Sequence, residues 1–193
     1  MLIVKFMYKN CFIVISIFLM ISGFLSGCGN SISTKEEKKM TAEDTLKLAR
    51  TYNDSGLSYA RNEKDYNKAI YYFNKAIETK PNYDVAFSNR GNAYRLLKEY
   101  DKAIIDINKA IQISPHDTLL HHISGRVYKD SQQYEQAIEE FSKVIEMKML
   151  DSTLRASIYV ERGQAYFKIK KKDLADKDFR QARRFDPTTA IEQ

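Results

Sequence analysis

The stretch Gly91–Pro115, GNAYRLLKEYDKAIIDINKAIQISP, decides the fold, because a closely similar segment precedes it in the chain. That segment, Gly56–Pro81, reads GLSYARNEKDYNKAIYYFNKAIETKP. In both, apolar residues recur at steps of three and four, which is typical of one face of an α-helix. The sequence therefore predicts a helical unit that is repeated along the chain.

The same pattern occurs four times. A glycine is followed three residues later by a tyrosine, at Gly56/Tyr59, Gly91/Tyr94, Gly125/Tyr128 and Gly163/Tyr166. Further along each unit an alanine precedes a large apolar residue by four, at Ala69, Ala103, Ala137 and Ala175. The first two intervals between these alanines are equal, the third is four residues longer, and a proline closes three of the four units.

A period of about 34 residues with G-x-x-Y, A-x-x-x-F and Pro resembles the tetratricopeptide repeat. The resemblance covers about residues 42–187 and implies an all-α, right-handed superhelix of about four helix-turn-helix repeats. The expected repeats are about 49–83, 84–117, 118–155 and 156–189. Each pair leaves an apolar side uncovered, so neighbouring pairs must stack. We expect the glycine and alanine to let the paired helices approach, with aromatic rings filling the space between them.

The units differ from one another in a few places. The first carries one extra residue between Gly56 and Tyr66, and four extra residues separate units three and four. Four residues make about one helical turn, which predicts a lengthened helix on one side of that junction. Only six residues follow Pro187. We therefore expect the last helix to cover itself with its own cations, or a partner to cover it; these cations are Lys177, Arg180, Arg183 and Arg184.

The first thirty residues have a different character. Lys5 and Lys9 are their only charged side chains, and Cys11–Leu25 is nearly all apolar. This order is typical of a secretory signal peptide. Its end, Leu25-Ser26-Gly27-Cys28, resembles the bacterial lipobox, which implies that residues 1–27 are removed and that Cys28 is lipidated. The alternative is an uncleaved membrane anchor with an unmodified cysteine.

Either interpretation places the remaining chain in the bacterial cell envelope, facing the periplasm or the exterior. Residues 28–41 are polar and read as a flexible tether. In the lipoprotein family, an Asp after the lipidated cysteine is associated with retention in the inner membrane, so Gly29 favours the outer membrane. Nucleic acid is not an expected partner of an exported chain.

The sequence indicates neither catalysis nor a cofactor. It has no Gly-rich phosphate loop, no H-E-x-x-H and no C-x-x-C motif. His116, His121 and His122 are not spaced to share one helix face, so no metal site is predicted. His121 falls in a slot that usually holds an aromatic core residue, and His122 falls toward the inner face of the array. The alternative of an accessory enzyme or a cofactor- or metal-binding protein rests on these histidines.

The resemblance places the first helix of each repeat on a concave face where peptides commonly bind. The groove candidates are polar or basic: Asn53, Asn89, Asn92, Arg95, His122, Arg126, Lys129, Gln164 and Lys168. Asparagine amides can pair with a peptide backbone, and Arg95 and Arg126 are expected to receive carboxylates. The alternative is an ordinary solvated face. The two-carboxylate clamp of chaperone-tail binders is not matched, because Leu57, Leu119 and Ile123 occupy clamp positions.

Residues 168–184 are the most basic part of the chain, with eight cations against three acids. They predict either contact with anionic lipid or cell-wall polymer, or a solvated helix face. The chain as a whole resembles tetratricopeptide lipoproteins that serve pilus, outer-membrane or cell-wall machinery. This implies a membrane-anchored, non-catalytic scaffold with a protein or peptide partner. A self-assembling repeat protein is the remaining alternative.

Overall fold

The computed structural model describes residues 40–147 and 151–188, and every regular element in these residues is helical. The helices are α2 (Ala42–Ser58), the π-helix η1 (Tyr59–Glu63), α3 (Tyr66–Thr79), α4 (Asp84–Leu96), α5 (Tyr100–Ile113), α6 (Thr118–Asp130), α7 (Tyr134–Glu146), α8 (Ser152–Lys168) and α9 (Lys172–Phe185). The predicted signal peptide at 1–27, Cys28 and most of the tether at 28–41 lie outside the described residues.

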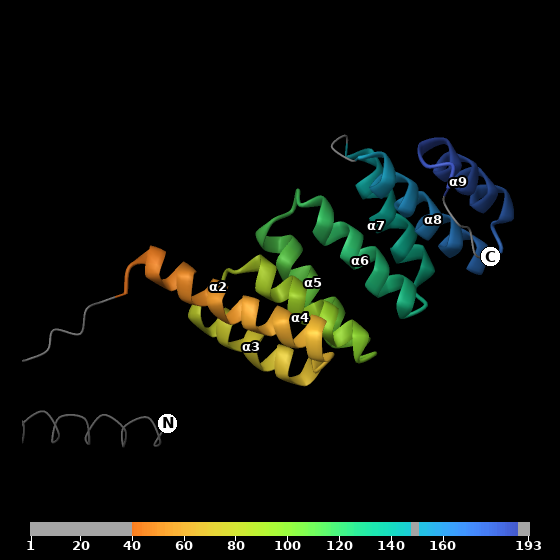
Figure 1. Cartoon of the computed structure of the whole chain (residues 1–193). Helices are drawn as coiled ribbons and strands as arrows, with labels where there is room; N and C mark the ends of the chain where they lie inside the picture. Colours follow the sequence, from red (N-terminus) through yellow and green to blue (C-terminus); the bar gives the residue numbers. More distant parts are fainter. Residues whose placement is uncertain (1–39, 148–150, 189–193) are drawn as a thin grey trace, which may run out of the picture. The chain divides into compact units, whose positions relative to one another are not determined.

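The helices form four pairs that stack in chain order, from α2–α3 to α8–α9 (Figure 1). Within each pair the two helices share their most extensive contacts. The second helix of a pair then packs against the first helix of the next pair, and the first helices of neighbouring pairs also touch. This arrangement confirms the predicted all-α solenoid.

The glycine of each pair lies where the second helix approaches most closely. A Cβ atom added at Gly125 would lie 2.5 Å from Cε1 of Phe141, and one added at Gly56 would lie 2.5 Å from Cε1 of Phe73. Real Cβ atoms essentially never come this near to another atom. The motif alanines on the opposing helices, Ala69, Ala103, Ala137 and Ala175, are fully buried. The small residues therefore permit the close approach that their spacing predicts.

Both irregularities in repeat length are absorbed within first helices. α8 has 17 residues where α4 and α6 have 13, and Asp151 caps its N-terminus by accepting a hydrogen bond from the Leu154 amide. α7 has 13 residues where the other second helices have 14, so it is not lengthened, and the four-residue insertion extends the first helix of the last pair. The extra residue of the first unit lies in η1, where the backbone widens locally to a π-helix. Such single-turn π-bulges accommodate an inserted residue without ending the helix.

The turn inside each pair has the same backbone conformation. A residue with positive φ stands two positions before each second helix: Lys64, Lys98, Gln132 and Lys170, with φ between 54° and 63°. None of the four is glycine, although this region favours glycine. Lys64, at the end of η1, takes the same role as its counterparts. The widened turn therefore leaves the connection to α3 unchanged.

Three positions of each second helix form what we call the stacking row, which receives the next pair. Its members are Ile70, Phe73 and Ile77 in α3, Ile104, Ile107 and Ile111 in α5, Ile138, Phe141 and Ile145 in α7, and Asp176, Phe179 and Arg183 in α9. In α5, the row packs against Ile123 and Val127 of α6. In α9, two isoleucines are replaced by exposed charged residues. The last pair therefore presents a charged surface where the others present an apolar one.

Candidate functional site

The first helices α2, α4, α6 and α8 carry the predicted groove residues, and neighbouring first helices touch one another. We call their shared surface the inner face. Several predicted residues here bind one another across helices. Asn89 on α4 donates a hydrogen bond from Nδ2 to Oδ1 of Asn53 on α2, at 2.8 Å. Asn53 is only 3% exposed, so its amide joins two repeats instead of facing a ligand.

Arg95 is also engaged within the chain. Its Nη1 is paired with the carboxylate of Asp130 on α6, and its Nε donates to Oδ1 of Asn92 at 3.0 Å. The Arg95 side chain is largely buried. The carboxylate that we expected from a peptide is thus supplied by Asp130, and Arg95 serves as a link between repeats two and three.

A denser polar cluster joins α6 to α8 around Glu161. His122 Nε2 lies 2.9 Å from Oε2 of Glu161, while Arg126 Nε and Lys129 Nζ lie 3.7 Å and 3.9 Å from Oε1. Lys129 also donates to Oε1 of Gln164 at 3.2 Å. The structure therefore brings four predicted residues together around one partly buried carboxylate. Lys168, at the end of α8, is exposed and makes no ion pair with the described residues.

The charge of Glu161 depends on this cluster. Burial opposes ionisation of the carboxyl, but the hydrogen bond with His122 and the positive charges of Lys129 and Arg126 outweigh burial. The pKa of Glu161 is consequently lowered from its ordinary value of 4.5. The carboxylate therefore remains ionised at neutral pH and links α6 to α8.

This lowered pKa predicts a loss of stability in acid. A carboxyl whose pKa is lower in the folded state stabilises the fold above its unfolded pKa, and this contribution is lost as the pH falls through the folded value. We expect Glu161→Gln to destabilise the protein at pH 7 and to lose less stability than the wild type once the pH falls below 4.5. Urea unfolding at a series of pH values measures this. Parallel pH profiles for the two proteins would contradict the prediction.

The inner face also carries open positions, of which three are apolar. Val85, Leu96 and Leu119 are 44%, 41% and 58% exposed. Val85, Asn92 and Leu96 follow one another at steps of seven and four, which places them on one side of α4. Leu119 and Arg126 occupy the equivalents of the first two positions on α6, in the next repeat. We call Val85, Asn92, Leu96, Leu119 and Arg126 the open stripe.

Sequence reasoning found only part of the open stripe. Asn92 and Arg126 are among the predicted groove residues, whereas Leu119 was noted only as a departure from a carboxylate clamp. Val85 and Leu96 were missed. The signal that identifies Val85 is its separation from Leu119 by one repeat period, which puts two exposed apolar side chains at equivalent positions of adjacent repeats.

The adjacent histidines point apart, as predicted. His121 is buried, with Nδ1 2.7 Å from Oε2 of Glu140 and Nε2 3.0 Å from the carbonyl oxygen of Pro115. It therefore joins α6 to α7 and to the turn before α6. His122 belongs to the Glu161 cluster, and His116 is exposed. In residues 40–147 and 151–188, no three His, Cys, Asp or Glu side chains gather closely enough to hold a metal ion.

Two arginines that sequence reasoning missed fasten the second helices together. Arg90 donates from Nε and Nη2 to both oxygens of Asp106 at 2.7 and 2.6 Å, and from Nη1 to Asn74 on α3 at 2.6 Å. Arg162 makes the equivalent contacts with Asp178 and with Ser142 on α7, at 2.8 to 2.9 Å. We call each set an arginine staple.

Both staples are largely sheltered from water, with the arginine side chains 19% and 17% exposed and the aspartates 5% and 4%. Burial lowers the pKa of the Arg90 guanidinium, but its hydrogen bonds to Asp106 outweigh burial, and the net pKa is raised above the ordinary value. The same causes act in the same directions on Arg162 and its partner Asp178. The sequence signal is an arginine directly before the motif glycine, combined with an aspartate directly before the large apolar residue of the second helix. This combination occurs in repeats two and four.

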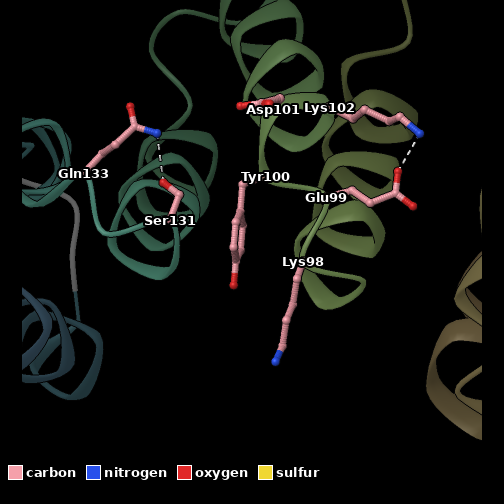
Figure 2. Close-up of a pocket in the computed structure, with 7 residues that line it drawn as sticks. All are labelled: Lys98, Glu99, Tyr100, Asp101, Lys102, Ser131 and Gln133. Atoms are coloured by element: carbon pink, nitrogen blue, oxygen red, sulfur yellow. Dashed lines mark hydrogen bonds and ion pairs between the residues drawn. The ribbon is translucent and has the colours of Figure 1, made fainter.

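A polar pocket of about 380 Å³ lies at the edge of repeats two and three, away from the open stripe. Tyr100 stands between the α4–α5 turn and the α6–α7 turn (Figure 2). Glu99 pairs with Lys102 at 2.5 Å, and Gln133 donates to Oγ of Ser131 at 3.1 Å. These two contacts each join a pair of lining residues, and the lining places no nucleophile beside a base. This pocket therefore gives no support to the enzyme alternative.

The amino-terminal predictions are not addressed by this geometry. Cys28 lies outside the described residues. Among the helices that the structure describes, none combines the length and the apolar character needed to cross a membrane.

Comparison with known proteins places these features in a family. Models of the tetratricopeptide repeat match residues 49–83, 85–117, 120–148 and 156–189. Together these matches cover most of the chain. No curated protein matches the sequence.

Several solved structures share the fold. MamA residues 41 to the end, from Desulfovibrio magneticus RS-1, is 19% identical with a TM-score of 0.65, and the alignment covers 73% of this chain and 77% of that one. PilF of Pseudomonas aeruginosa is 17% identical with a TM-score of 0.68, covering 75% and 64%. The first repeat domain of Spaghetti (RPAP3), bound to an HSP90 peptide, is 21% identical with a TM-score of 0.52, covering 72% and 93%. These similarities support the α-solenoid.

Proposed function

Because the chain belongs to the tetratricopeptide repeat family, whose members typically act as non-catalytic scaffolds for protein partners, we propose that it is a membrane-anchored scaffold of the bacterial cell envelope. The observation that carries the binding part of this proposal is the open stripe. Most polar groups of the inner face are engaged within the chain, yet Val85, Leu96 and Leu119 remain exposed along the face that also carries Arg126. Exposed apolar side chains that share one face with an exposed cation indicate an interaction surface.

The chemistry of the open stripe defines the partner. Apolar side chains of a peptide would cover Val85, Leu96 and Leu119, and a carboxylate would reach Arg126. The Arg126 side chain is 44% exposed, and its ion pair within the described residues is a long contact with Glu161. Asn92 would offer its remaining amide groups to the peptide backbone. The proposed ligand is therefore a protein segment that combines apolar side chains with at least one acidic residue.

A matched pair of variants tests the open stripe. We expect Leu119→Asp/Arg126→Glu to weaken binding of peptides selected on the purified protein by about tenfold or more, which corresponds to about 1.4 kcal/mol. The control is Ile105→Asp/Lys109→Glu on α5, which changes an exposed apolar residue and a nearby lysine outside the inner face. Isothermal titration calorimetry measures the affinities, and thermal melting verifies the fold. If the two variants bind the selected peptides with equal affinity, the open stripe is not the binding site.

Anchoring rests on the lipobox resemblance at Leu25–Cys28. Acyl chains on Cys28 would hold the protein at the membrane, since two or more chains bind stably where one is marginal. We expect cells expressing the protein to incorporate labelled palmitate into it. Cys28→Ser should abolish the label and leave a precursor that retains residues 1–27. Absence of label in the wild type as well would rule out the lipoprotein interpretation.

The self-assembly alternative is disfavoured by the stacking row. A further repeat of this kind, or a second copy stacking end to end on α9, would bury Asp176 and Arg183. Burying a charge without a partner is costly. Light scattering that shows concentration-dependent growth of the purified repeat array would reverse this conclusion.

A further inference from the structure

The last repeat concentrates the positive charge of the molecule. Eight cations lie between Lys168 and Arg184, and all are exposed: Lys168, Lys170, Lys171, Lys172, Lys177, Arg180, Arg183 and Arg184. Of the three acids in this segment, Asp178 is neutralised in the arginine staple of Arg162, which leaves the exposed Asp173 and Asp176. Counted formally, with all three aspartates included, this segment carries five of the six net positive charges of the whole chain.

These cations share one surface of α9. With 3.6 residues per turn, Lys172, Lys177, Arg180, Arg183 and Arg184 fall within an arc of about 140°. The buried side of the helix, formed by Ala175, Asp178, Phe179 and Ala182, lies opposite. Among the described residues, none of the eight cations forms an ion pair. Their charge is therefore directed outward and is not cancelled locally. We call this surface the basic end.

The neighbouring second helix has the opposite character. α7 exposes Glu135, Glu139 and Glu146, and its one lysine, Lys143, is paired with Glu139 and Glu140. The charge thus changes sign from α7 to α9. When negative and positive charges are separated in this way, the field of an anionic surface orients the molecule. α9 then faces the surface and α7 faces away from it.

We propose that the basic end docks on the anionic phospholipid headgroups of the membrane that carries the anchor. This inference rests on the anchoring part of the proposed function. A tether keeps the local concentration of the basic end at the membrane high, so a contact that is weak by itself becomes occupied. Mobile headgroups can adapt to cations spread over a convex helix, whereas an acidic protein would need a shaped site. Clustered lysines and arginines that can reach a membrane surface are typical of binding to anionic lipid.

Docking in this way would fix the orientation of the repeat array at the membrane. The stacking row explains why the surface is available, since Asp176 and Arg183 replace the isoleucines that would receive another repeat. The long aliphatic stems of lysine and arginine let the charged groups reach the headgroups while α9 stays folded on α8.

Lysine footprinting on the full chain tests this proposal. The protein is held by its own amino-terminal segment on vesicles of phosphatidylcholine alone, or with about one third phosphatidylglycerol. Acetylation is followed by mass spectrometry. We expect Lys171, Lys172 and Lys177 to react about threefold more slowly on the anionic vesicles, with no change at Lys109 on α5. The protection should disappear at about 0.5 M salt, where charges beyond a few ångströms are screened.

Two charge variants sharpen the result. Arg180→Glu/Arg184→Glu should abolish the protection of Lys172 and Lys177, while Lys47→Glu/Arg61→Glu, which changes the net charge equally at exposed sites of α2 and η1, should retain it. Equal acetylation rates on both vesicle types would overturn the proposal. So would protection by soluble polyglutamate without protection by anionic vesicles, which would indicate an acidic protein. If the wild-type protein incorporates no palmitate, the proposal of a lipid anchor fails, but the acetylation result on vesicles is unaffected. The failure of the anchor and the failure of the docking proposal are therefore distinguishable.

Discussion

Replacing Arg90 by methionine is expected to lower the free energy of unfolding by about 3–5 kcal/mol, because Asp106 would remain as a buried carboxylate without its partner. Asp106 is only 5% exposed and receives two hydrogen bonds from Arg90. Methionine keeps much of the aliphatic stem of arginine and removes the charge and the donors. Chemical denaturation followed by circular dichroism measures the loss.

Two control variants test whether the loss of stability comes from leaving a buried charge without its partner or from removing a charge as such. Arg90→Met/Asp106→Leu should recover most of the stability, since a buried ion pair can often be exchanged for apolar residues at little cost. Lys75→Met removes an ion pair with Glu78 that is exposed to solvent, and it should change stability little. If Arg90→Met costs no more than Lys75→Met, the staple does not hold the repeats as the structure indicates.

Gly125→Ala is expected to destabilise the protein by about 2 kcal/mol. The sign is the informative part. Helix propensity alone predicts a gain of about 1 kcal/mol when alanine replaces glycine inside a helix. At this position the added methyl would lie 2.5 to 2.9 Å from three ring atoms of Phe141, a fully buried side chain that would have to shift as a rigid ring. A higher melting temperature for Gly125→Ala would contradict the packing.

The equivalent change in another repeat provides the comparison. At Gly91 the added methyl would meet Cδ1 of Ile107 at 2.9 Å and the backbone carbonyl oxygen of Ala103 at 3.2 Å; the end of a flexible side chain can shift more easily than a ring, and the backbone contact is less severe than the ring contacts at Gly125. We therefore expect Gly91→Ala to cost less than Gly125→Ala. A double-mutant cycle with Phe141→Leu should show favourable coupling, since the smaller side chain makes room for the methyl group.

The repeat period predicted the fold closely, for a physical reason. The repeated pattern records which side chains must be small and which must be large, and Gly125, Ala137 and Phe141 fill those roles in the structure. The sequence also predicted a lengthened helix between units three and four. It could not choose between α7 and α8, because helix propensity allows either, and the cap at Asp151 makes the choice.

The inner face was harder to predict. Residue types indicated a polar surface, but hydrogen-bond partners depend on how far each repeat is rotated against the next. Thus Asn53 binds Asn89, and Arg95 binds Asp130, although each pair is about one repeat apart in sequence. The exposed apolar residues were not predicted, because one exposed valine such as Val85 is ordinary on a protein surface. It becomes informative only when Leu119, at the equivalent position of the next repeat, is also found to be exposed.

The stacking of each pair only on its neighbours has a kinetic consequence. Within the part of the chain that the structure describes, extensive contacts join only helices that are close in chain order. Such an array has mostly local contacts, which favours rapid folding, and its parts need not open together. The terminal helix pair can unfold locally while the interior pairs remain folded. Amide exchange should therefore be faster in α9 than in α5, and cutting the Arg162 staple should accelerate exchange in α8 and α9 while leaving α4 and α5 protected.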